Sequence, residues 1–212
     1  SVSFFVISHG VATDAIPVIA FLVYIPTSFL ALTLLILFTK LNGFQVLSSA
    51  LLSVVYLAIP FSLLHFLLYD ITPPSISGYA PELVVLLFFM IWFNDSWAYI
   101  FGRWLGKHKL FPSISPKKTW EGFIGGTLIT LAFSFVVSLF YKEYTTQDIL
   151  IMGFLMATMG SVGDLVQSKL KRTAGVKDSG NIIPGHGGLL DRFDAFLFAI
   201  PFIACYLFLM YY

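Results

Sequence analysis

The segment between Asp164 and Asp194 holds the side chains of this sequence that are best suited to chemistry. It carries nine charged residues next to a glycine-rich turn, in a chain of which only 11% of the residues are charged and 58% are apolar. Charge gathered at one place in so apolar a chain is kept against a large cost of desolvation. We therefore expect this segment to form a functional site.

Carboxylates at a similar depth in the chain's apolar stretches indicate a metal site. They are Asp95, Asp164, Asp191 and Asp194. Asp191 and Asp194 are three residues apart and therefore share one face of a helix. Asp164, Ser168 and Lys171 form a polar stripe along another helix. Several carboxylates at one depth repel one another unless a cation neutralises them, and oxygen ligands of this kind suit Mg²⁺.

Ion pairing within the protein is the other explanation for these aspartates. Neighbouring cations that could neutralise them are Lys171, Arg172, Lys177 and Arg192. The run from Pro184 to Gly188 favours a binding site, because its three glycines around His186 allow backbone N–H groups to curl around an anion ahead of a helix N-terminus. Carboxylates for a metal, cations and a glycine-rich turn together describe a polyphosphate site.

A second basic segment lies in the stretch SPKKTWEG. Ser115 before Pro116 predicts a helix N-cap followed by a proline in the first turn. Lys117 and Lys118 would then lie at a helix N-terminus, where anions are already favoured. Both a phosphate contact and placement of the ammonium groups at the membrane interface are compatible with this position.

The elements that must position these residues are transmembrane helices. A mean hydropathy of +0.89 and 23 Phe among 212 residues exceed what a soluble domain buries. Apolar runs long enough to cross ~30 Å of hydrocarbon lie at about 15–39, 44–69, 82–101, 120–141, 148–170 and 189–212. The sequence predicts an all-α, polytopic membrane protein with about six spans, or up to eight if Pro17, Pro26 and Pro60 split the first two. A G-x-x-x-G step at Gly122 and Gly126 predicts close packing between helices.

The distribution of charge orients these spans. Eleven of the twelve Lys and Arg fall in the odd-numbered connections, and only Lys142 falls on the opposite side. The positive-inside tendency makes the basic side cytoplasmic. We expect residues 1–81 to be N-terminal transmembrane helices and residues 82–212 to be a catalytic region with cytoplasmic loops at 102–119 and 171–188. Because the chain begins like the end of an apolar segment and without Met, we also expect helices before it.

The stretch SKLKRTAGVKDSGNIIPGHGGLLDRFD, from Ser168 to Asp194, resembles the signature of phosphatidate cytidylyltransferases, also called CDP-diacylglycerol synthases. The match is close along all 27 residues. The SPKKTWEG stretch and the N-D-S of Asn94 to Ser96 resemble two further parts of that family. The resemblance extends over roughly residues 90–212, whereas the first part of the chain matches only as generic spans.

The resemblance implies transfer of the cytidylyl group of CTP to phosphatidic acid, which gives CDP-diacylglycerol and pyrophosphate. It implies Mg²⁺ as the cofactor, and it allows a monovalent cation such as K⁺ beside it and a homodimer. No nucleic-acid partner is expected. The implied location is the cell membrane, the inner membrane of a bacterium, with the active site at the cytoplasmic face of a multi-pass protein.

The residues and the resemblance together lead to specific roles. Metal ligands are predicted to be Asp164, Asp191 and Asp194, and the catalytic groups are predicted to be these three with Lys171 and His186. For His186 both donation to a phosphate and action as a base stay open. The predicted substrate-binding residues are Asp95, Lys117, Lys118, Ser168, Arg172, Lys177, Asp178, Gly187, Gly188 and Arg192.

Other classes of protein share part of this pattern. An enzyme that uses CTP with another lipid, such as a CDP-archaeol synthase or a lipid kinase, would need a similar pocket and would differ in its tail-binding spans. A cation-coupled transporter would also carry aspartates inside its spans. The charges of this chain gather at one face of the membrane rather than near its middle, and no inverted repeat is visible in the sequence. Both observations favour nucleotide chemistry over transport.

Overall fold

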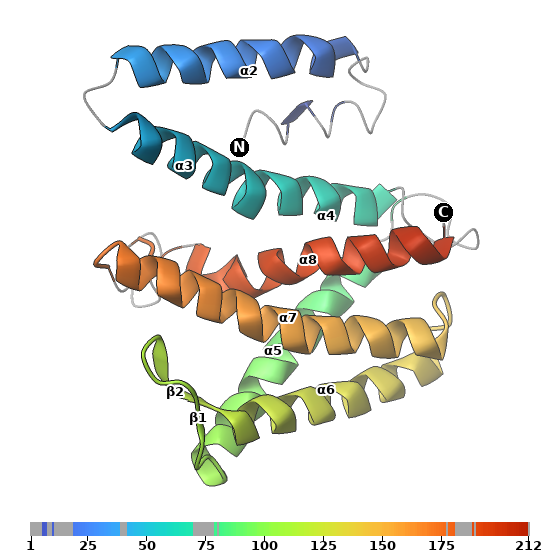
Figure 1. Cartoon of the computed structure of the whole chain (residues 1–212). Coiled ribbons are helices and arrows are strands. Elements are labelled where there is room, and N and C mark those ends of the chain that lie inside the picture. The colour runs from blue at the N-terminus through green and yellow to red at the C-terminus, as the bar shows by residue number, and fades with distance from the viewer. Residues whose placement is uncertain are drawn as a thin grey trace. The chain divides into compact units, whose positions relative to one another are not determined.

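Helices make up nearly all of the chain that the computed structural model describes, namely residues 6–7, 10, 19–38, 42–69, 79, 81–176, 178–180, 188 and 190–211. The elements, in chain order, are α2 (Ile19–Phe38), α3 (Gly43–Ser53), the π-helical turn η1 (Val54–Ala58), α4 (Ile59–Tyr69), α5 (Pro81–Trp104), β1 (Lys109–Phe111), β2 (Ser115–Thr119), α6 (Trp120–Phe140), α7 (Thr146–Thr173) and α8 (Leu190–Tyr211) (Figure 1). The predicted all-α class is confirmed, and one short hairpin adds to it.

Among the described residues, five helical segments are long and apolar enough to cross a membrane. They are Gly43–Leu68, Pro81–Trp104, Trp120–Phe140, Thr146–Thr173 and Leu190–Tyr211. These segments match five of the six predicted spans. The first predicted span, at about 15–39, overlaps α2, in which Pro26–Phe38 forms a shorter apolar helix. The chain is therefore a polytopic membrane protein.

Pro60 does not split the second predicted span. Proline has no N–H to donate to the carbonyl of Tyr56, four residues earlier, and its ring crowds that carbonyl. The helix widens into the π-helical turn η1 at this point and continues as α4. A widened turn of this kind accommodates the irregular hydrogen bonding without ending the helix.

The chain forms two compact units, Ser1–Phe66 and Leu67–Tyr212, and every candidate site residue lies in the second. The predicted functional division near residue 81 stays a prediction. Within the second unit α7 is central, because it contacts α5, α6 and α8. Figure 1 shows α6, α7 and α8 side by side, with α5 crossing them. The core between α7 and α8 includes Met152, Met156 and Ile200, whose side chains are fully buried.

The helices α5 and α6 approach closely where α6 lacks side chains. A Cβ at Gly126 would lie 2.9 Å from the Cβ of Ala98 and 3.0 Å from the carbonyl oxygen of Asn94. Farther along the same contact, Phe93 and Phe133 stack with their ring centroids 4.6 Å apart. The close packing predicted from the G-x-x-x-G step is confirmed, and it fixes the position of α5 against α6.

The predicted helix start at Ser115 is wrong. Residues Ser115–Thr119 form β2, which pairs antiparallel with β1. Helix α6 begins only at Trp120, and the hydroxyl of Thr119 caps it by accepting the N–H of Gly122 at 3.2 Å. Pro116 is tolerated in β2 because a two-stranded hairpin has open edges that need no N–H donor. Lys117 and Lys118 therefore project from a strand rather than from a helix N-terminus.

Asp148 joins the other end of α7 to the end of α8. Its carboxylate accepts hydrogen bonds of 2.6 Å from the hydroxyl groups of both Tyr206 and Tyr211. The same carboxylate completes a capping box with Thr145 at the start of α7. These contacts fix the relative position of α7 and α8 along their length, which brings the charged ends of the two helices together.

We expect Gly126→Val to destabilise the contact between α5 and α6. The new side chain would overlap Ala98 and the Asn94 backbone, and overpacking of this kind costs roughly 1–3 kcal/mol, which lowers the Tm by about 3–10 °C. Thermal unfolding in detergent measures this effect. Ala132→Val, at an exposed position of α6, adds the same branched bulk and should change the Tm little. Equal Tm values for both variants would contradict the packing described here.

Candidate active site

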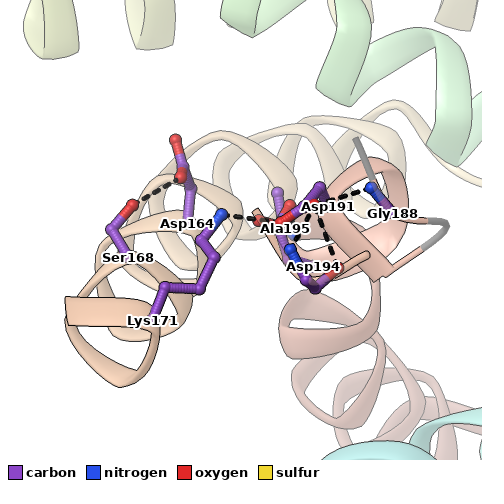
Figure 2. A network of polar contacts seen from close by, with 8 residues as sticks. Asp164, Ser168, Lys171, Gly188, Asp191, Asp194 and Ala195 are labelled. Carbon is purple, nitrogen blue, oxygen red and sulfur yellow. Dashed lines mark hydrogen bonds and ion pairs between the residues drawn. The ribbon is translucent and has the colours of Figure 1, made fainter. Parts of the chain in front are cut away.

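An ion pair between α7 and α8 forms the centre of the candidate site. The Nζ atom of Lys171 lies 2.7 Å from Oδ1 of Asp191. The two side chains are only 16% and 10% exposed, so the pair is shielded from solvent. Figure 2 shows Lys171 reaching from α7 toward Asp191 at the start of α8. Each charge satisfies the other in a setting where either one alone would be costly.

The second carboxylate oxygen of Asp191 organises the chain before α8. It accepts the backbone N–H of Ser179 at 2.8 Å and its hydroxyl at 2.9 Å. It also accepts the N–H of Gly188 at 2.9 Å. Gly188 has no room for a side chain, since a Cβ there would lie 2.8 Å from the backbone nitrogen of Gly180. Asp191 therefore binds both Ser179, which follows α7, and Gly188, the last residue of the predicted glycine-rich turn.

The end of α7 turns the chain toward this carboxylate. Gly175 has a φ of 71°, a left-handed conformation that glycine adopts at little cost. The N–H groups of Gly175 and Val176 donate to the carbonyls of Arg172 and Lys171 at 3.1 and 3.0 Å, which satisfies the end of the helix. This turn allows Ser179 to reach Asp191.

A second ion pair joins the hairpin to α7. The Nζ atom of Lys118, in β2, lies 2.6 Å from Oδ2 of Asp164. Lys118 also donates to the carbonyl of Ser161 at 3.4 Å, and Ser168 donates to Asp164 at 3.3 Å. Figure 2 shows Asp164 and Ser168 on the part of α7 that also carries Lys171. The interpretation that the aspartates pair with cations therefore applies to both Asp164 and Asp191.

The structure brings the remaining two aspartates close to these pairs. Asp194 is 7% exposed, and its charge interacts with those of Asp164, Lys171 and Asp191. Asp95 on α5 interacts in the same way with Lys118 and Asp164. All four carboxylates that we singled out in the sequence thus meet around the ends of α5, α7 and α8.

Other predicted site residues lie at the surface or outside the described part of the chain. Arg172, Asp178 and Arg192 are exposed, and neither Arg172 nor Asp178 makes an ion pair within the described part of the chain. Lys177, His186 and Gly187 lie outside the residues that the structure describes, so their predicted roles stay predictions.

Next to Asp164 lies a cavity of about 630 Å³, bounded by α5, the hairpin, α6 and α7. The predicted residues Asp95, Lys117, Lys118 and Asp164 line it. Its wall also includes residues that our sequence analysis did not select, among them Tyr99, Arg103, Lys109 and Phe123. The basic character of the 102–119 connection was the available signal for Arg103 and Lys109. Nothing in the sequence indicated that Tyr99 and Phe123 share a wall with them.

The carboxylates offer a suitable donor set for a hard cation, although they do not form a closed metal shell. Among the described residues no three His, Cys, Asp or Glu side chains are grouped closely enough to hold a metal by themselves. Mg²⁺ usually binds proteins through one or two carboxylates and takes its other ligands from water and substrate phosphates. One or two of the four carboxylates would be enough for that smaller requirement.

Comparison with known proteins agrees with the geometry of the site. The sequence model of the cytidylyltransferase family matches residues 1–210. This chain, a polytopic membrane protein with a charged site at the ends of its helices, belongs to the cytidylyltransferase family. The family resemblance seen in the sequence is thereby confirmed.

The relatives of this chain include several bacterial enzymes. The phosphatidate cytidylyltransferase of Staphylococcus saprophyticus is 39% identical over 180 residues, which cover 84% of this chain and 66% of the relative. Those of Staphylococcus haemolyticus and Staphylococcus aureus are 40% and 38% identical over 189 residues, with the same coverage. The chain thus spans 66% of the length of these curated relatives.

We expect Asp191→Ala to loosen the segment before α8. The amide hydrogens of Ser179 and Gly188 would lose their acceptor, so their exchange with deuterium should become at least about tenfold faster. Hydrogen exchange read by mass spectrometry on peptides that contain these amides measures the change. Asp178→Ala removes an exposed carboxylate from the same segment and serves as the control. Unchanged protection in Asp191→Ala would contradict the organising role of Asp191.

Proposed function

We propose that this chain carries the catalytic region of a membrane enzyme that transfers the cytidylyl group of CTP to phosphatidic acid. The products would be CDP-diacylglycerol and pyrophosphate. The observation that carries the proposal is the cluster of ion pairs at the meeting of α7, α8 and β2, in a chain of the cytidylyltransferase family. The names of its relatives support the choice of both substrates.

In the proposed reaction an oxygen of the lipid phosphate attacks the α-phosphorus of CTP. A new P–O bond forms, the bond from the α-phosphorus to the oxygen shared with the β-phosphate breaks, and pyrophosphate leaves with the electron pair. A phosphate monoester is already ionised near neutral pH, so no general base is required. The protein has to hold two anions in line and offset their charge.

The paired cations are suited to that task. Lys171 and Lys118 each lie beside a carboxylate, so each can share its N–H donors between that carboxylate and a phosphate oxygen. The N-terminus of α8 adds a positive electrostatic potential near Asp191 and Gly188, which favours a bound anion. Both features place positive potential where the phosphates of two substrates would meet.

We further propose that Asp164, Asp191 and Asp194 are ligands of Mg²⁺. When bound, this ion would offset the negative charge of the phosphates during transfer. The carboxylates contribute hard oxygen donors near the junction of α7 and α8. Lys118 and Lys171 neutralise the charges of Asp164 and Asp191 when no substrate is bound. A monovalent cation such as K⁺ as a second ion belongs to the same proposal.

The membrane location is consistent with the chemistry. We propose that the site lies at the cytoplasmic face of the cell membrane, because most Lys and Arg fall in the connections that share one face, and basic connections tend to be cytoplasmic. A site at helix ends allows a lipid to present its phosphate from the bilayer while the nucleotide arrives from water. A homodimer, which the family resemblance allows, is part of this proposal.

A transfer assay on the complete protein in detergent tests the function. With CTP labelled at the α-phosphate, label should enter the lipid phase only when phosphatidic acid and Mg²⁺ are both present. Asp164→Asn should lower kcat/KM at least about 100-fold, because a proposed metal ligand and the partner of Lys118 are lost together. Glu143→Gln, which changes a carboxylate in the connection between α6 and α7, should retain the activity of the unchanged protein.

Several outcomes would contradict the proposal. Transfer of the label to another lipid but not to phosphatidic acid would show that the acceptor is that other lipid. Absence of nucleotide binding, together with cation flux in vesicles, would favour the transporter hypothesis. Near-normal Mg²⁺-dependent turnover of a folded Asp164→Asn variant would remove Asp164 from the metal ligands.

A further inference from the structure

The cavity beside Asp164 is distinct from the Lys171–Asp191 pair and differs from it in chemistry. It lies between the ends of α5 and α6, and the hairpin lines one side of it. Only Asp164 and Ser161 of α7 reach its wall, whereas Lys171, Asp191 and Asp194 do not line it. Asp164 therefore lies at a junction, with the cavity on one side and the Lys171–Asp191 pair on the other.

The charge of the cavity suits a phosphate monoester. Four cationic side chains line it, namely Arg103, Lys109, Lys117 and Lys118, against the two carboxylates Asp95 and Asp164, so the wall has a formal excess of two positive charges. Lys118 is paired with Asp164. Arg103, Lys109 and Lys117 make no ion pair within the described part of the chain. A phosphate monoester carries about 1.5–2 negative charges near neutral pH, which matches this excess. A nucleoside triphosphate carries considerably more.

Apolar side chains also line the cavity. They include Ala98 on α5, Phe123 on α6 and Leu110 on β1. Tyr99, which also lines the cavity, is 66% exposed, and the neighbouring Phe111 and Trp120 are each 48% exposed. Exposed aromatic side chains at the end of a transmembrane helix are typical of the membrane interface. The cavity therefore combines a cationic wall with aromatic side chains of the kind found at the level of the lipid headgroups.

We propose that this cavity binds the phosphate monoester headgroup of the lipid acceptor. Arg103 and Lys109 hold the phosphate oxygens, and Ala98, Leu110 and Phe123 contact the carbon atoms next to the headgroup. Lys118 and Asp164 then lie where the lipid phosphate meets the α-phosphate of the nucleotide, whose remaining phosphates bind on the side of Lys171 and Asp191. This assignment rests on the proposed function and adds to it a division of the site into two parts.

Variants that each remove one positive charge between the end of α5 and the start of β1 test the assignment. Arg103→Gln and Lys109→Gln are compared with Lys107→Gln, which removes a cation of the same connection that does not line the cavity. Binding of phosphatidic acid to the complete protein without CTP is measured by native mass spectrometry, with phosphatidylglycerol, a phosphodiester, as the competing lipid. KM values for phosphatidic acid and for CTP are measured in parallel.

We expect both cavity variants to weaken binding of phosphatidic acid about tenfold each, because each loses a charge-assisted hydrogen bond to the phosphate. The KM for phosphatidic acid should rise by a similar factor, while the KM for CTP and the binding of phosphatidylglycerol stay within about twofold. Lys107→Gln should leave all four quantities unchanged. Thermal unfolding of each variant confirms that the fold is retained.

Lipid binding and the KM values are measured separately, so the test distinguishes failure of the cavity assignment from failure of the proposed reaction. A rise in the KM for CTP instead of that for phosphatidic acid would overturn the assignment in favour of a nucleotide pocket. Unchanged lipid binding in folded variants would overturn it as well. If no transfer occurs but both variants weaken phosphatidic acid binding, the lipid subsite stands and the proposed reaction fails.

Discussion

Compensation of charge at the ends of apolar helices is the constraint on which this structure depends. A bilayer cannot solvate an ammonium or a carboxylate, so each such group inside a span needs a partner or access to water. Lys171 meets Asp191 across α7 and α8, and Lys118 meets Asp164 across β2 and α7. Both pairs lie at the same end of α7. The need to satisfy charge therefore holds together the elements that form the candidate site.

Close helix packing makes these pairings geometrically possible. On α7, a Cβ at Gly160 would lie 2.7 Å from a side-chain carbon of Ile91, and one at Gly163 would lie 2.5 Å from the Cβ of Phe198. The absence of side chains at both positions lets α5 and α8 approach α7 closely. At the far end, Asp148 holds the tyrosines of α8. The long helix is thus fixed along its length, and its charged end has a defined position before any substrate arrives.

The same charged groups suit the chemistry that we propose. Cations and carboxylates that neutralise each other would present both signs of charge to the proposed substrates, one for phosphate oxygens and one for a metal ion. Their place at the helix ends also suits the proposed pair of substrates, of which one would reside in the bilayer and the other in water. The hairpin adds a cationic wall on one side of Asp164, and the Lys171–Asp191 pair lies on the other.

Much of this could be predicted from the sequence, because composition and local spacing act over short distances. Hydropathy determined the membrane class and five of the spans, and the signature from Ser168 to Asp194 indicated the family. The hairpin was missed, since its strands are short and Ser115–Pro116 is also a common helix start. The contact between Lys118 and Asp164, 46 residues apart, and the shared wall of Tyr99, Arg103 and Phe123 were decided only by the tertiary structure. Such contacts depend on where helices cross and how closely glycines let them approach, and no periodicity along the chain encodes that geometry.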